Sequence, residues 1–241
     1  MTGLADALRR GLAKRGDPAR ASGMQAYMRS AMPYRGVSTP ERRLLVREVV
    51  ADLGAPADRA AWESTARELW DDAGFREERY VALDLCRHRS ARAWQDPATV
   101  PMYDHFVVTG AWWDHVDAVA IGLLGPILRA HRVDVEPVVR TWIDDDDPWR
   151  RRTSIILQNG ARADTDTALL ADAVLASADD AGFFLRKGIG WALREYAKTD
   201  PAWVRTFVAS HASRLAPLAQ REALKHVGQR ASKDSPDSGQ M

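Results

Sequence analysis

Apolar residues recur along this chain at intervals of three and four positions, and no stretch alternates between apolar and polar residues as a half-buried strand would. The pattern predicts an all-α protein. Its clearest helix start is the hydroxyl cap at Ser38, followed by Pro40 and the first-turn carboxylate of Glu41. The expected helices, with ends placed to within about two to four residues, cover 2–14, 24–31, 40–53, 57–71, 75–91, 97–109, 113–130, 133–143, 148–159, 164–177, 181–199, 201–210 and 218–230.

Short loops join these helices, and successive helix pairs recur every few tens of residues without a strict consensus. Two architectures fit this pattern: a curved α-α superhelix, or solenoid, of degenerate helical repeats, and a compact helical bundle. A solenoid offers a long concave surface to a rod-shaped partner. We expect one domain over 1–230 and a disordered tail over 231–241, because the tail is rich in Ser, Asp, Gly and Pro.

The composition indicates a folded protein with a large core and excludes several other classes of protein. The chain has 241 residues, 46% of them hydrophobic, and nine Trp, which is enough to bury a sizeable core. The single Cys86 excludes an intramolecular disulfide framework and every multi-cysteine zinc pattern. No uncharged apolar run reaches the roughly 18 to 20 residues that cross a bilayer, and the first residues lack the apolar run of a signal peptide. We therefore expect a cytoplasmic protein, monomeric by default.

Charge is segregated along the chain. The 34 basic and 33 acidic residues give a net charge of only +1. Basic residues nevertheless predominate over 1–47 and again over 150–230, whereas acidic residues predominate over 48–149. The basic ends can therefore supply salt-dependent affinity for a polyanion in spite of the small net charge.

The predicted helix 181–199 has two different faces. One is an apolar stripe formed by Leu185, Ile189, Leu193 and Tyr196. The other places an indole among cations, namely Lys187, Trp191, Arg194 and Lys198. Such a face suits a surface that meets phosphates with its cations and a base or sugar with its ring. The alternative is a Trp191 buried under the neighbouring repeat, with the cations solvated.

A second unusual segment is the start of the predicted helix 113–130. Its core stripe consists of Trp112, Val116, Val119 and Leu123, which leaves Trp113 and Asp117 one turn apart on the flank. An indole face and a carboxylate side by side can stabilise a developing cation. Alternatively, Asp117 pairs with a neighbouring helix while Trp113 fills a gap. The nearby His115 is expected on the surface without a special role, and the six His residues lack the spacing of a metal site.

Three consecutive arginines, Arg150, Arg151 and Arg152, follow the helix start at Pro148. A helix N-terminus combined with Arg attracts phosphate. Pairing with the preceding acidic run, 144–147, is the alternative, and both can hold for different arginines.

Seven segments, in order along nearly the whole chain, resemble the bacterial DNA alkylation repair glycosylases of the AlkD family, which are built from HEAT-like repeats. These segments are MQAYM (24–28), TPERR (39–43), RELW (67–70), VALDL (81–85), WWDHVD (112–117), IGWALREYAKT (189–199) and APLAQREALKHV (216–227). Gly188 is a departure from that pattern. It lies inside a predicted helix close to Gly190, where glycine costs roughly 1 kcal/mol of helix stability relative to Ala.

The resemblance implies hydrolysis of the N-glycosidic bond of cationic N3- and N7-alkylated purines, such as 3-methyladenine and 7-methylguanine, in duplex DNA, without a metal or an organic cofactor. It implies that Asp117 is the catalytic carboxylate and that Trp113 and Trp191 are the two active-site tryptophans. The implied DNA contacts are Tyr27, Arg152 and Arg194, to which we add the neighbouring cations Arg151, Lys187 and Lys198. The competing hypothesis is a non-catalytic helical-repeat module that binds DNA or protein on its concave face, which the presence of Asp117 and both tryptophans disfavours.

Overall fold

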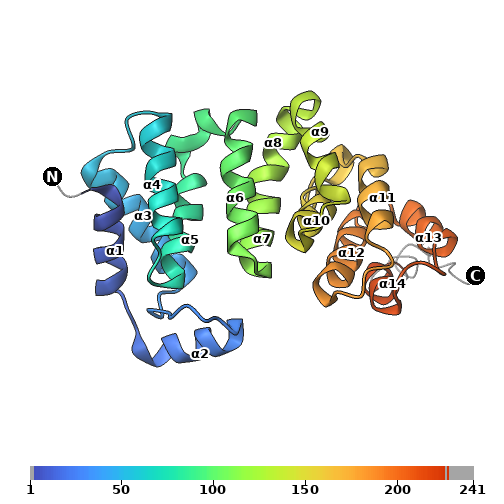
Figure 1. The fold of residues 1–241 in the computed structure, drawn as a ribbon, viewed down its shortest axis with the longest axis horizontal. Helices are drawn as coiled ribbons and strands as arrows, with labels where there is room; N and C mark the ends of the chain where they lie inside the picture. Colours follow the sequence, from blue (N-terminus) through green and yellow to red (C-terminus); the bar gives the residue numbers. More distant parts are fainter. Residues whose placement is uncertain (1–2, 226, 228–241) are drawn as a thin grey trace, which may run out of the picture. The chain divides into compact units, whose positions relative to one another are not determined.

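The structure is a computed structural model that describes residues 3–225 and 227. Over these residues the secondary structure is helical with no strand, which confirms the predicted all-α class (Figure 1). The predicted disordered tail, 231–241, lies outside the described residues. The α-helices are α1 (Leu4–Lys14), α2 (Pro18–Met28), α3 (Thr39–Leu53), α4 (Arg59–Asp71), α5 (Arg76–Cys86), α6 (Val100–Gly110), α7 (Trp113–Val119), α8 (Gly125–Ala130), α9 (Arg132–Ile143), α10 (Pro148–Ile156), α11 (Thr167–Ala176), α12 (Phe183–Tyr196), α13 (Pro201–Ser210) and α14 (Pro217–Leu224).

The chain forms two compact units, Met1–Met102 and Tyr103–Met241. In the first unit α1, α3 and α5 pack against one another, and α4 covers α1 and α5. In the second unit alternate helices stack, α10 on α12, α12 on α14, and α9 on α11, while α10 also contacts α7, α9 and α11. This stacking of every second helix is the packing of a helical repeat. The prediction of a single domain over 1–230 stays a prediction.

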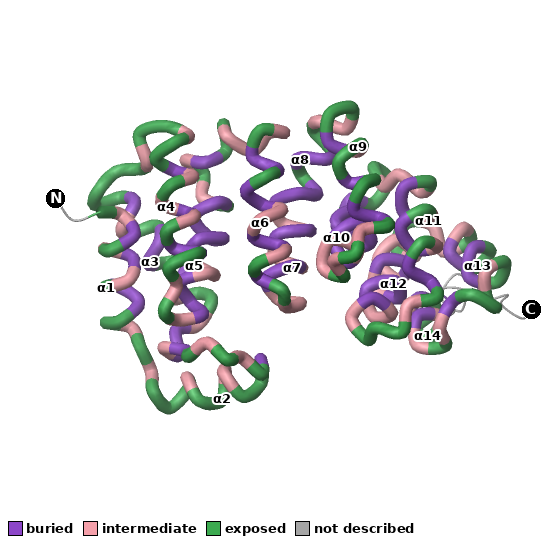
Figure 2. The backbone as a smooth tube through the Cα atoms, viewed as in Figure 1, coloured by how far each residue is buried: buried purple, intermediate pink, exposed green. Residues whose placement is uncertain are grey.

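The apolar stripes predicted around α7 and on α12 are buried except at their aromatic ends, Trp112 and Tyr196, which keep part of their surface exposed. Buried residues recur along both helices (Figure 2). On α7 and the turn that follows it, Val116, Val119 and Leu123 are buried as expected. Leu185, Ile189 and Leu193 form the buried stripe of α12, and Cys86 lies in the core of the first unit. No helix in the described part of the chain combines the length and the apolarity needed to cross a bilayer.

Helix ends follow local capping chemistry. α3 begins at the predicted place, after Ser38, and the structure adds a capping box in which Ser38 and Glu41 bond reciprocally. α2 begins at Pro18, six residues before the predicted start at 24, because the Asp17 side chain accepts hydrogen bonds from the backbone N–H groups of Ala19 and Arg20. In place of the predicted helix 75–91, α5 ends at Cys86, and a separate 3₁₀ segment, Arg89–Trp94, follows it.

The predicted helix 113–130 is interrupted by a π-helical turn, Ala120–Leu124, between α7 and α8. The backbone at Gly125 then lies against the end of α10, where a Cβ would lie only 2.2 Å from the carbonyl oxygen of Leu157. π-turns inside α-helices are frequent at functional sites. This turn directly follows the segment that carries Asp117.

The segment between α2 and α3 is bound to α5 by one buried carboxylate. Glu77, on the first turn of α5, is fully buried and accepts hydrogen bonds from the backbone N–H groups of Arg35, Gly36 and Val37. Gly36 has φ 82°, and a Cβ there would lie 2.1 Å from the carbonyl oxygen of Asp17. The close approach therefore requires glycine at this position.

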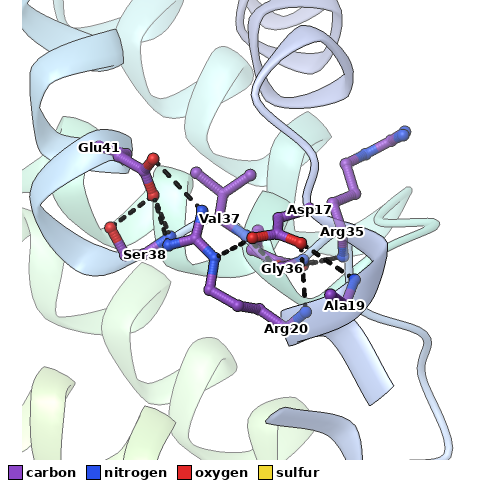
Figure 3. A network of polar contacts seen from close by, with 9 residues as sticks. Asp17, Ala19, Arg20, Arg35, Gly36, Val37, Ser38 and Glu41 are labelled. Carbon is purple, nitrogen blue, oxygen red and sulfur yellow. Dashed lines mark hydrogen bonds and ion pairs between the residues drawn. The ribbon is translucent and has the colours of Figure 1, made fainter. Parts of the chain in front are cut away.

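Arg20 on α2 bridges the two helix starts. Its guanidinium donates to Asp17 at 2.7 Å and to both oxygens of Glu41 at 3.1 and 3.3 Å (Figure 3). The Ser38 hydroxyl and Arg20 lower the pKa of Glu41 to about 2. Together with Glu77, these contacts fix α2 to the rest of the first unit.

Candidate active site

Asp117 on α7 and Arg152 on α10 form a bidentate ion pair. Arg152 Nε lies 2.8 Å from Asp117 Oδ1, and Nη2 lies 2.9 Å from Oδ2. Two parallel charge-assisted hydrogen bonds fix both side chains in one geometry. The Asp117 side chain keeps 13% of its surface exposed, whereas that of Arg152 keeps 5%. One edge of the carboxylate can therefore still meet a ligand.

The remaining donor of Arg152 reaches a third helix. Its Nη1 donates to the carbonyl oxygen of Phe184, in the first turn of α12, at 2.5 Å. A Cβ on residue 188, one turn further along α12, would lie 3.0 Å from this Nη1. Gly188, a departure in the sequence pattern, thus has a structural reason: it leaves room for the guanidinium that holds Asp117.

The pKa of Asp117 is raised above its ordinary value of 3.8. Burial is the largest cause, the hydrogen bonds and charge of Arg152 act in the opposite direction, and the nearby carboxylate of Asp114 adds a smaller increase. Asp117 is therefore a desolvated and comparatively basic carboxylate, whose charge depends on one arginine.

The two tryptophans stand on partly exposed helix flanks, as predicted. Trp113 is the first residue of α7, one turn before Asp117, and Trp191 lies on α12 away from the buried stripe. Neither ring is fully buried. The alternative in which Trp191 is wholly covered by a neighbouring repeat does not hold.

An aromatic cluster that the sequence did not predict supports the Arg152 acceptor. The Phe184 ring centroid lies 5.3 Å from those of Trp112 and Trp149 and 5.5 Å from that of Phe183. These rings come from the starts of α7, α10 and α12, so the cluster fixes the start of α12 and with it the Phe184 carbonyl. The adjacent aromatic pairs Trp112-Trp113 and Phe183-Phe184 are the sequence signal that could have indicated it.

The arginine triplet separates into three different ion pairs. Arg150 binds both oxygens of Asp104 and also reaches Asp145, at 3.2 Å, in the acidic run. Arg151 binds Asp180 at 2.9 Å. Arg152, which the resemblance made a DNA contact, directs its fork at Asp117 instead of at solvent. The phosphate contacts expected of Arg151 and Arg152 stay predictions.

Glu222 on α14 forms ion pairs with two of the other residues that are predicted to contact DNA. Lys187 Nζ lies 3.1 Å from its Oε1, and Arg194 Nη1 pairs with its Oε2. Lys187 is the main cause of the lowered pKa of Glu222. The close packing that brings Glu222 there depends on Gly190, since a Cβ at 190 would lie 2.5 Å from Glu222 Cβ.

The predictions for Lys198, Tyr27 and His115 have different outcomes. Lys198 lies in the turn after α12, where it is exposed and pairs with Glu195 of that helix at 2.6 Å. Tyr27 lies on α2, in the first unit, with 77% of its surface exposed. The expectation for His115 was wrong: it is fully buried, because it sits beside Val116 on the inner side of α7. Within residues 3–225 and 227, no group of three or more His, Cys, Asp or Glu could hold a metal ion.

Comparison with known proteins identifies the family. A family model described as DNA alkylation repair enzyme matches residues 8–227. The chain belongs to the DNA alkylation repair enzyme family. A solved structure, described as a predicted DNA alkylation repair enzyme from Enterococcus faecalis, is 29% identical with a TM-score of 0.74, covering 89% of this chain and 98% of that one. A search of curated proteins finds no match.

This membership confirms the resemblance carried by the seven segments. It also confirms the repeat fold class, since the family's solved relative shares the fold over most of the chain. The family places the protein among enzymes of DNA repair.

Proposed function

We propose that this family member is a DNA glycosylase that hydrolyses the N-glycosidic bond of cationic N3- and N7-alkylated purines, such as 3-methyladenine and 7-methylguanine, in duplex DNA. The observation that supports it most is Asp117, a partly exposed carboxylate held by Arg152 one helical turn from the indole of Trp113. No metal or organic cofactor takes part in the proposed reaction.

Alkylation at N3 or N7 gives the purine a positive charge and makes it a good leaving group. The bond from C1′ to the purine nitrogen breaks, its electron pair neutralises the base, and the sugar acquires oxocarbenium character. Water then adds to C1′ and loses a proton. The chemical demand on the protein is therefore to stabilise a positive sugar and to orient one water.

Asp117 meets both demands. A carboxylate in a partly desolvated site interacts strongly with a nearby cation, because little water screens it. Its raised pKa makes it a better proton acceptor for the attacking water than an ordinary aspartate. Arg152 holds the carboxylate ionised and in a fixed orientation, which makes it a positioning residue for the reaction.

The two indoles supply further electron density. Trp113 and Trp191 would line the deoxyribose with their negative ring faces, each of which attracts a cation. The duplex contacts remain those expected from the sequence: Tyr27, Arg151, Arg152, Lys187, Arg194 and Lys198. Phosphate contacts of this kind set the position of the protein on the duplex without reading its sequence.

Release of 7-methylguanine from methylated duplex DNA tests the proposal. Wild type should release the base, and Asp117→Asn should slow release by about 100-fold or more, the effect of losing one electrostatic stabiliser in a water-poor site. Asp104→Asn is the matched control, because Asp104 also binds an arginine fork, that of Arg150, at 2.8 and 2.7 Å. It should release base as wild type does.

Equal release by wild type and Asp117→Asn would remove the assigned role. Wild type that binds duplex DNA but releases no base would favour the non-catalytic binding module.

A further inference from the structure

A hollow of about 690 Å³ in the first unit carries a concentration of positive charge that the proposed reaction does not use. Four arginines line it, Arg43 and Arg47 from α3 and Arg87 and Arg89 from the end of α5 and the segment after it, together with His88 and Asp84. Four guanidinium groups thus share a space with a single carboxylate.

That carboxylate is already neutralised. Asp84 is buried and binds Arg42 Nε at 2.5 Å through Oδ2, while Arg43 Nε lies 3.5 Å from its Oδ1. Asp84 carries one negative charge, whereas the two arginines that it contacts carry two positive charges. The positive potential of the hollow therefore remains after this pairing.

Arg47 and Arg89 are the cations left to bind something else. Both are exposed, and neither has a carboxylate of the described residues within ion-pair distance. The buried side chains of Val46 and Val50 line the same hollow. An exposed guanidinium pair of this kind fits the oxygens of a phosphate.

The pKa of His88 is sensitive to the positive charges of Arg47 and Arg89. Its pKa is lowered by burial first and then by the charges of Arg89 and Arg47. The neutral ring is also suited to its place, because Nδ1 lies 3.3 Å from the backbone N–H of Ser90, which donates to it. The charged groups that line the hollow together with His88 are the four arginines and Asp84.

We propose that this hollow binds a backbone phosphate of duplex DNA, so that the first unit has its own contact to the duplex, independent of damage. The contact runs through Arg47 and Arg89, and it takes no part in base release. The inference rests on the proposed function for its choice of DNA, because a free phosphate ion would present the same oxygens.

Binding of undamaged duplex, measured by fluorescence anisotropy over a range of salt concentrations, tests the proposal. The double variant Arg47→Gln, Arg89→Gln should bind about tenfold more weakly at low salt, as expected for two exposed ion contacts. Its slope of log K against log salt should fall by about 1 to 2, since each phosphate contact contributes about 0.9. The matched control Arg10→Gln, Lys14→Gln removes the same charge from exposed positions of α1 outside the hollow and should bind as wild type does.

The pKa of His88, followed by NMR in wild type, provides a readout that needs no variant. Duplex DNA should raise this pKa, because a phosphate placed between Arg47 and Arg89 cancels part of the positive potential. Inorganic phosphate at the same phosphate concentration should leave it unchanged.

The proposal fails if both double variants lose affinity equally, or if duplex DNA leaves the pKa of His88 unchanged. A rise with inorganic phosphate but not with duplex also overturns it, because the hollow then binds a free anion. Normal base release by the Arg47, Arg89 variant on saturating methylated duplex is expected, and it separates this contact from the reaction. If the proposed glycosylase activity fails while the binding results hold, the hollow remains a duplex contact of a non-catalytic protein.

Discussion

The guanidinium of Arg152 occupies the space that a side chain on residue 188 would need. Its Nη1 lies 3.0 Å from the position of a Cβ at Gly188, and the same group holds Asp117 through its other two donors. A glycine on one helix therefore controls the orientation of a carboxylate on another, through an arginine on a third.

Gly188→Ala should separate activity from stability. Alanine gains about 1 kcal/mol of helix propensity, but its methyl group displaces Arg152, so the melting temperature should change little. Base release should fall about tenfold to a hundredfold, since misplacing a reacting group by a fraction of an ångström is costly. Thermal melts and single-turnover assays measure the two effects.

Gly190→Ala is the matched control on the same helix. Its Cβ would lie 2.5 Å from Glu222 Cβ and 3.0 Å from the Ala219 carbonyl oxygen. It should destabilise the packing of α12 on α14 by about 1 to 3 kcal/mol. If Gly190→Ala loses activity while Gly188→Ala retains it, the role given to Arg152 is wrong.

The acid limb of the pH–rate profile should reveal the environment of Asp117. Activity requires the ionised carboxylate, so it is lost as the pH falls through a pKa that burial raises above 3.8. Arg152→Gln removes the group that lowers this pKa, and the limb should move to higher pH. Asp114→Asn removes a group that raises it, and the limb should move to lower pH. Shifts in the same direction would rule out Asp117 as the titrating group.

Glu222→Gln tests whether Lys187 and Arg194 contact DNA. Glu222 pairs with both cations, so removing its charge frees them. If they bind phosphates, undamaged duplex should bind more tightly, with a steeper dependence on salt. Asp172→Asn, which breaks the exposed pair with Arg140, is the control. An unchanged affinity and slope for Glu222→Gln would show that both cations serve only the packing of α14.

Glu77→Ala should destabilise the protein by about 3 kcal/mol or more, because it leaves three backbone N–H groups of the segment before α3 without their acceptor. Urea unfolding measures the change. Glu68→Ala, which removes an exposed ion pair with Arg9, should cost less than about 1 kcal/mol. Equal costs would mean that the segment is held by something other than Glu77.

Much of the helical pattern was predictable because it is local. The spacing of Val116 and Val119 identifies the buried face of α7, and Ser38 with Glu41 marks the start of α3 within a few residues of sequence. The same local reasoning placed Trp113 and Asp117 together on one flank. The predicted start of α2 is wrong because the observed start depends on Asp17 and Pro18, which precede the few apolar positions of this helix.

The partners of the site residues were not predictable, because they lie far apart in the chain. Asp117 and Arg152 are 35 positions apart, and so are Lys187 and Glu222. Three successive arginines looked equivalent in sequence. Their different carboxylates follow from the packing of α7, α10 and α12, which no periodicity encodes.

The π-helical turn at Ala120–Leu124 bears on how the chain tolerates changes in length. A turn of this kind holds one more residue than an α-helical turn does. Shortening it by one residue would restore an unbroken helix from 113 to 130 while leaving Trp113 and Asp117 upstream of the cut. Such a deletion would rotate the residues after the cut by about 100° relative to α7, and would therefore move Leu123, Leu124 and Gly125 out of the positions in which they pack against the core and α10. The extra residue thus sets the register of α8 against α10 independently of the position of Asp117.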